Sequence, residues 1–417
     1  MSHVRVLWGN GRYRKLFVAR TISNLGNGIA PIAIAFGVLA LPEGSPTALS
    51  IVLAAQAIPL VIVLPLGGVI ADRFGRARVI AISDLILSGV VAITAALFAT
   101  GNATVPVLAV LMFITGILNA LWWPAYSGLI PDVVEDEYLQ PANAYVSMAS
   151  NGGLIVGAAL GGLLVATVGP GFAIAVDAVS FLVAGLLVFS FRHVSKPHVS
   201  GESMLGDLVH GWRVFTSFRW VVVVVASFSI IVMALFGAEQ VMGPVFAVEQ
   251  YGGEKEGAKA WAAVLAVQAF GLLVGAVVAS RVRIRRPMLF GMLLTLALPA
   301  WLVALAFAAP LWVIALGSFA WGVAIELFQV LWFTALQTNV PREALSRVGA
   351  YDAMGSLMFG PIGLAIAGPM IVLVGLKAGF LIFAAIALIA ILLSLLSKSV
   401  RSLQSAATPG ELEAIDE

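Results

Sequence analysis

The chain has 417 residues, of which 61% are apolar and only 11% are charged. Soluble domains average about 45–50% apolar and about 25% charged residues, so this composition excludes an ordinary water-soluble protein. There is no cysteine, which excludes disulfides, thiol catalysis and cysteine-bound metal centres. The composition indicates a protein that crosses a membrane many times.

Apolar runs of 20 or more residues recur along the chain, separated by short polar or Gly/Pro breaks. Each run is long enough to span a bilayer as a helix, and the period-2 alternation of a membrane barrel is absent. The expected fold is therefore an all-α membrane protein with twelve transmembrane helices. The predicted spans are 16–41, 47–71, 79–99, 104–130, 142–168, 171–191, 220–248, 260–280, 287–308, 311–336, 347–374 and 376–397.

Lys and Arg are distributed very unevenly between the two sides of these spans. Twenty of the 23 fall on the side that carries both termini, and Lys255, Lys259 and Lys377 fall on the other. Basic residues concentrate on the cytoplasmic side of membrane proteins. We therefore expect a multi-pass protein of the cell (inner or plasma) membrane with both termini in the cytoplasm.

Two pairs of segments repeat at nearly the same offset. Residues 67–78 align with 275–286 at an offset of 208, and 137–162 align with 343–368 at an offset of 206 with nine identities. This predicts a duplicated six-helix unit, which gives two pseudo-symmetric bundles. The expected parts are a cytoplasmic N-terminus (1–15), a bundle (16–191), a cytoplasmic linker (192–219), a bundle (220–397) and a disordered cytoplasmic tail (398–417). In the linker, helical spacing of apolar residues predicts an amphipathic surface helix through Leu205, Leu208, Trp212 and Phe215.

A charged motif follows the second predicted span and reads Gly68-x-x-x-Asp72-Arg73-x-Gly75-Arg76-x-Arg78. At this loop it resembles motif A of the major facilitator superfamily, and the span count, linker and half-repeat also resemble that superfamily. The resemblance implies a cytoplasmic latch in which Asp72 faces the start of the eleventh helix. It also implies that Arg73 or Arg76 meets an acid below the fourth helix, here Asp132. The alternative is that the arginines only fix topology.

The fifth predicted helix carries Gly153, Gly157 and Gly161 at steps of four, followed by Gly162. The run resembles motif C of proton-driven exporters, although Ala158 stands where that motif has proline. Such spacing also serves close helix packing, so both interpretations stay open. The segments 131–150 and 343–356 further resemble the bacterial exporter branch that contains siderophore exporters and macrolide or multidrug efflux pumps.

Three acids lie well inside the predicted spans. Glu326 is near the middle of the tenth, whereas Glu239 and Asp177 lie toward the outer side of the seventh and sixth. A carboxylate in the membrane costs at least about 2.5 kcal/mol, which makes each a functional candidate. We expect proton coupling at one of these three, with Glu326 first. For Asp177 a structural hydrogen bond between helices is the alternative.

Other polar and aromatic residues in the spans have weaker assignments. Asp84 and Asp352 are expected in first helical turns, where they complement the helix dipole. Arg20 is expected to extend to the cytoplasmic surface. The tryptophans at 122 and 123 either anchor the membrane interface or stack on a substrate. Candidates for the substrate cavity are Asn24, Asn27, Gln329, Trp332 and Phe333.

These observations predict a secondary active transporter that works by alternating access, with proton-coupled export (antiport) of a small amphipathic or hydrophobic compound such as a drug or siderophore. Nutrient uptake by a symporter or facilitator is the alternative. An intramembrane enzyme or lipid-moving scaffold is disfavoured because no metal-binding, nucleophile or nucleotide motif is present. We expect no metal, no cofactor and no nucleic-acid partner, and the sequence implies no oligomer.

Overall fold

The computed structural model describes residues 3–194, 212–279, 281–282 and 284–404, and in these ranges the chain is helical without strands. Twelve helices are long and apolar enough to cross a membrane. The predicted all-α fold with twelve spans is therefore confirmed. The structure does not test the division into two bundles or the cytoplasmic placement of the termini, which stay predictions.

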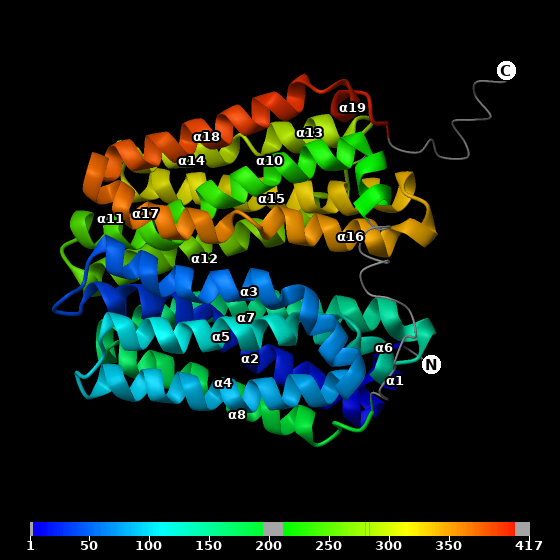
Figure 1. Cartoon of the computed structure of the whole chain (residues 1–417), viewed down its shortest axis with the longest axis horizontal. Coiled ribbons are helices and arrows are strands. Elements are labelled where there is room, and N and C mark those ends of the chain that lie inside the picture. The colour runs from blue at the N-terminus through cyan, green and yellow to red at the C-terminus, as the bar shows by residue number, and fades with distance from the viewer. Residues whose placement is uncertain (1–2, 195–211, 280, 283, 405–417) are drawn as a thin grey trace. The chain divides into compact units, whose positions relative to one another are not determined.

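The first six spans are each one uninterrupted helix (Figure 1). Gly75 explains one of the sharpest connections among them, because its φ of 89° lies in the region that favours glycine and lets two spans follow each other without a loop. The helices are α1 (His3–Gly9), α2 (Gly11–Leu39), α3 (Pro46–Phe74), α4 (Arg76–Ala99), α5 (Val105–Ser127), α6 (Leu129–Val133), the short 3₁₀ turn η1 (Asp136–Tyr138), α7 (Leu139–Val168) and α8 (Pro170–Phe189).

Three of the last six spans are interrupted. The seventh contains a π-helical segment, η2 (Gly237–Met242), followed directly by an α-helix that starts at Gly243. The ninth span is interrupted at Thr295–Leu296 and the eleventh at Met358–Phe359. The helices are α10 (Arg219–Phe236), α11 (Gly243–Gln250), α12 (Glu254–Ala279), α13 (Pro287–Leu294), α14 (Ala297–Ala306), α15 (Leu311–Asn339), α16 (Arg342–Leu357), α17 (Gly360–Val374), α18 (Leu376–Leu396) and α19 (Lys398–Arg401).

The chain forms two compact units, each described here by itself. The first unit comprises residues 1–201, 236–266 and 361–379, and the second comprises 202–235, 267–360 and 380–417. In the first unit α2 packs against α7 and α8, α3 against α5, and α4 against α5 and α8. In the second unit α15 packs against α13 and α14.

The structure describes only part of the predicted linker helix and of the predicted disordered tail. Leu205 and Leu208 lie outside the described residues. Residues 212–217 are helical, but Trp212 and the buried Phe215 pack on the ring of Tyr351 in the second unit. The predicted disordered tail begins with a short helix, α19, and residues 405–417 lie outside the described part of the chain.

Candidate functional site

A cavity of about 270 Å³ lies inside the first unit. Its wall is mostly apolar and includes Phe181 and Phe236. A smaller set of polar side chains comes from six different helical segments: Asn27, Gln56, Thr94, Thr115, Asn119, Asp177 and Gln240. An apolar cavity with a few polar groups at defined positions is the usual form of a site for a small organic molecule.

Asp177 is the ionisable side chain among the described residues of this wall, and it is 2% exposed. The Ser180 hydroxyl lies 3.2 Å from the Oδ1 of Asp177 and 2.7 Å from its carbonyl oxygen. On the facing helix α2, a Cβ at Gly26 would overlap both Asp177 and Ser180, so only glycine leaves room for them. The predicted interhelical hydrogen bond of Asp177 is therefore replaced by a bond within its own helix.

The two predicted asparagines of α2 differ in position. Asn27 lines the cavity. Asn24 is buried against Gly153 of α7, and its Oδ1 lies 3.5 Å from the Nη2 of Arg20. Sequence reasoning missed Gln56, Asn119 and Gln240, although an amide inside an apolar span was a signal that could have found them.

The three predicted cavity residues of α15 differ in burial. Trp332 is buried in an aromatic cluster with Trp220 and Phe328, whereas Gln329 and Phe333 are exposed. The indole of Trp332 donates a hydrogen bond of 2.8 Å to Asp352. Residues 329, 332 and 333 share one side of the helix, since they are three and four positions apart, and their role in a substrate cavity stays a prediction.

Glu326 and Glu239 lie apart from the cavity wall. Glu326 is half-buried on α15, next to α12, where a Cβ at Gly275 would lie 2.8 Å from the Cβ of Glu326. Glu239 is half-buried in the π-helical segment, directly before the cavity residue Gln240. Their roles as proton sites stay predictions.

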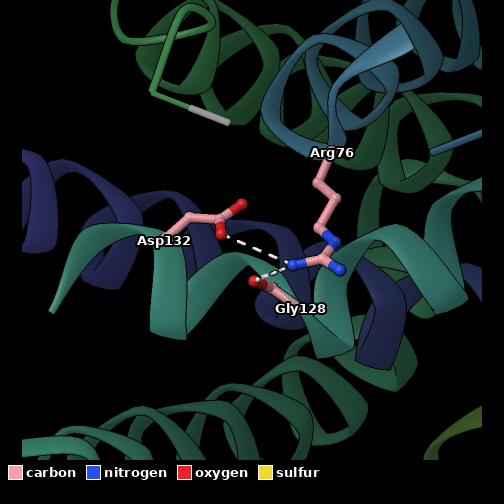
Figure 2. Close-up of polar contacts among 3 residues, drawn as sticks. All are labelled: Arg76, Gly128 and Asp132. Atoms are coloured by element: carbon pink, nitrogen blue, oxygen red, sulfur yellow. Dashed lines mark hydrogen bonds and ion pairs between the residues drawn. The ribbon is translucent and has the colours of Figure 1, made fainter. Parts of the chain in front are cut away.

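The motif A loop brings Arg76 and Asp132 together (Figure 2). The Nη1 of Arg76 lies 3.4 Å from the Oδ1 of Asp132 and donates a hydrogen bond of 3.1 Å to the carbonyl oxygen of Gly128. This is the contact that the resemblance implied for Arg76. Arg73 and Arg78 are exposed. The side chain of Asp72 and those of the first residues of α16 lie outside what the structure describes, so the latch itself stays a proposal.

The glycines of α7 make close helix packing. A Cβ at Gly157 would overlap the carbonyl oxygen of Leu25 and lie 3.0 Å from the Cα of Gly28 on α2. A Cβ at Gly153 or Gly161 would lie 3.0 Å from the α2 backbone, at Thr21 and Ile29 respectively. The packing interpretation of this stripe is therefore confirmed, and the structure does not test its link to export.

The fourth glycine, Gly162, makes a different contact that has a repeat-related partner. A Cβ at Gly162 would overlap the Cβ of Ala262 on α12 and approach the carbonyl oxygen of Ala258. Gly368 of α17, its counterpart in the repeat, packs on α3 and donates its N–H to the Oγ of Ser50 at 2.8 Å. Both contacts join helices from the two sequence repeats within the first unit.

Three predictions about charged residues near the predicted cytoplasmic end are wrong. Asp84 lies two turns inside α4 and is 3% exposed, and Asp352 lies more than two turns inside α16, so neither caps a first turn. Both helices begin earlier than the apolar runs indicated. The guanidinium of Arg20 does not extend to a surface but lies over the rings of Trp122 and Tyr126, at 4.4 and 4.2 Å from their centroids.

Twelve helices that are long and apolar enough to span a membrane, together with a mostly apolar cavity inside the first unit and no metal-binding cluster among the described residues, are typical of a membrane transport protein. The Major Facilitator Superfamily profile matches residues 16–358. The chain belongs to this superfamily, which confirms the family resemblance expected from the sequence. It is a multi-pass transporter of a small-molecule substrate and not an enzyme.

Relatives and solved structures agree with this assignment. The chain is 29% identical to the multidrug efflux pump Tap of Mycolicibacterium fortuitum, with 88% of this chain and 90% of Tap covered. It is 26% identical to the enterobactin exporter EntS of Citrobacter koseri, with coverage of 84% and 85%. A mutant of the nucleoside transporter NupG shares the fold with a TM-score of 0.74 at 13% identity, covering 92% of this chain and 98% of that one.

Proposed function

We propose that this protein exports a small amphipathic or hydrophobic compound in exchange for protons, by alternating access. The observation that carries the proposal is the cavity of the first unit, whose wall is mostly apolar and holds the carboxyl group of Asp177. An apolar wall suits a substrate that also partitions into lipid. A single buried carboxyl group can bind a proton and release it when the environment changes.

Asp177 is a better proton site than the sequence indicated. Glu326 ranked first because it is central in its span, but Asp177 lines the cavity and is almost fully buried. A proton and a substrate can exclude each other only if they share a site or a coupled wall. We therefore place Asp177 first and keep Glu326 and Glu239 as the alternatives.

The direction of transport is proposed from the relatives, which include a multidrug efflux pump and an enterobactin exporter. The Lys and Arg distribution supports placement in the plasma membrane with both termini in the cytoplasm. With that orientation the contacts of Gly162 and Gly368 lie toward the outside. We propose that they part when the cavity opens outward, while the Arg76–Asp132 loop belongs to the cytoplasmic latch.

The mechanism requires the two repeats, 16–191 and 220–397, to move as bundles around the cavity. The contacts of Gly162 and Gly368 suit this motion. Helices that meet at a glycine can separate without first moving a side chain out of the way. The hydrogen bond from Gly368 to Ser50 adds one polar contact that must break at each opening.

The test uses proteoliposomes that contain a labelled compound and an imposed pH gradient. Asp177→Asn should abolish transport driven by the gradient while exchange of labelled for unlabelled compound continues, because exchange needs no net proton transfer. Glu326→Gln and Glu239→Gln are the parallel variants. Unchanged gradient-driven transport in Asp177→Asn would contradict the role of Asp177, and selective loss in one of the others would move the proton site there.

A further inference from the structure

A second buried polar cluster in the first unit is separate from the cavity. It consists of Arg20 on α2, Asp84 on α4, and Trp122 and Tyr126 on α5. The two aromatic rings are stacked, with centroids 5.0 Å apart and planes 10° apart, and the guanidinium lies over both. Asp84 faces Arg20 and Trp122.

The polar atoms of this cluster are poorly satisfied. The Oδ1 of Asp84, the Nε of Arg20 and the Nε1 of Trp122 are buried without a hydrogen-bond partner. Among the ion pairs of the described residues there is none between Arg20 and Asp84. Buried polar groups in proteins are nearly always hydrogen-bonded, so several orphans at one place require an explanation.

The protonation state of Asp84 supplies that explanation. An ionised carboxylate that is buried without a partner is strongly disfavoured, whereas a neutral carboxyl group is tolerated. Besides its contact with Asn24, Arg20 therefore has two alternative partners, which are the aromatic pair when Asp84 is neutral and the carboxylate when Asp84 is ionised. A guanidinium binds favourably to either.

The surroundings of Asp84 contain few competing charges. Among the described residues, the charged group that acts on it is Arg20 from α2, with the hydroxyl of Tyr126 on α5 behind that arginine. From α8 the backbone of Gly185 packs against the Cβ of Asp84. Arg20 is thus the partner that an ionised Asp84 would find.

The cluster is in register with the cavity. Seven residues separate Arg20 from Asn27, Asp84 from Val91, and Trp122 from Thr115, and the second member of each pair lines the cavity. Seven residues are two helical turns, about 10 Å, and return to nearly the same helix face. The same three helices therefore carry both sites on the same faces.

We propose that Arg20 and Asp84 form a proton-dependent switch beneath the cavity, in which loss of the Asp84 proton to water draws Arg20 from Trp122 and Tyr126 onto the carboxylate. The switch rests on the proposed proton-coupled function and adds to it a site outside the cavity. Movement of Arg20 shifts α2 relative to α4 and α5, which changes the cavity wall two turns away.

The first arm of the test is independent of transport and uses infrared spectroscopy of the purified full-length protein in lipid. The wild type should show a carbonyl band of buried neutral carboxyl groups with a component from Asp84 that disappears as pH rises, and Asp84→Asn should lack this component. Asp177→Asn is the matched control, since it removes the other buried aspartate of the first unit and should keep the Asp84 component. In Arg20→Gln the Asp84 component should persist to higher pH, because the ionised form has lost its partner.

The second arm measures exchange of labelled compound at several pH values without a gradient. Asp84→Asn should still exchange, with a rate that no longer varies with pH over the range in which the wild type varies several-fold. A band that is unchanged in Asp84→Asn or insensitive to Arg20→Gln would overturn the switch, and so would an unchanged pH profile of exchange. If the wild type moves no protons but both arms behave as expected, the antiport proposal fails and the switch stands.

Discussion

Asp84 in the first unit and Asp352 in the second both lie more than two turns after the start of their helices, but their surroundings differ. Asp352 accepts hydrogen bonds from the indole of Trp332 at 2.8 Å and from the hydroxyl of Ser356 at 3.2 Å. Asp84 has an unsatisfied Oδ1 and no ion pair with Arg20. The comparison indicates that Asp352 stabilises its unit, whereas Asp84 is kept in an unfavourable state that a functional change can relieve.

Close helix packing, in contrast, is similar in the two units. Both units contain glycines that bring helix backbones into contact, such as Gly157 on α7 and Gly271 on α12. A Cβ at Gly157 would overlap the carbonyl oxygen of Leu25, and one at Gly271 would overlap that of Phe319. The two units therefore bring helices together at glycines in the same way. They differ at their aspartates, because Asp352 is hydrogen-bonded and Asp84 has an unsatisfied oxygen.

The largest expected effect comes from filling those helix contacts. Gly157→Val and Gly271→Val should each destabilise the protein by about 3 kcal/mol, because the added atoms overlap backbone that has no room to move. The measurement is the fraction of monodisperse protein after heating in detergent. Gly152→Val is the control, since a Cβ at 152 meets nothing within 4 Å. Equal loss in the control would mean that β-branching, rather than packing, is responsible.

The second largest effect on stability is expected from substituting Asp352, with Asp84 as the comparison. Asp352→Asn should cost about 2 kcal/mol, the usual contribution of hydrogen bonds to a charged group. Asp84→Asn should be neutral or stabilising, because it replaces an unsatisfied acid with a neutral side chain. Thermal unfolding of both variants under the same conditions measures the difference. Two variants with equal destabilisation would remove the contrast on which the switch depends.

A smaller effect is expected at the contact between α3 and α17. Ser50→Ala should lower stability by about 1 kcal/mol through loss of the bond from the Gly368 N–H. It should also favour the outward-open state. Because the chain has no cysteine, pairs of introduced cysteines at the two helix ends can carry spin labels that report the distance directly. A distance distribution identical to that of the unmutated protein would argue against a gating role.

The smallest effect on stability is expected at the motif A loop. Arg76 and Asp132 are 35% and 24% exposed, so solvent screens their pair, and Asp132→Asn should change stability by less than about 1 kcal/mol. If the loop is a latch, the variant should instead change the rate of transport. Substrate affinity measured on the purified variant should be unchanged, and an equal loss of affinity would contradict the latch.

The sequence predicted the large-scale features because their causes are local. Apolar runs of sufficient length define the spans, whereas the sides indicated by the basic residues and the two bundles indicated by the repeat between 137–162 and 343–368 stay predictions. The contact of Arg76 with Asp132 was implied by the resemblance of this loop to motif A.

The predictions that were wrong depend on where helices begin and on contacts between residues that are distant in the sequence. Asp84 was assigned to a first turn because α4 begins with polar residues that do not look like part of a span. The prediction that Arg20 extends to the surface was wrong because its aromatic partners are about one hundred residues away in the sequence. The packing of Trp332 on Trp220 was not predicted, because the two residues are more than one hundred positions apart in the sequence.

The most direct test of proton-coupled export is proton flux in proteoliposomes that contain a pH-sensitive dye, with a panel of amphipathic compounds added outside. The account predicts proton movement that depends on the compound, runs opposite to it, and is lost in Asp177→Asn. Transport of a labelled compound without any proton movement would contradict the account and leave a facilitator or a carrier coupled to another ion.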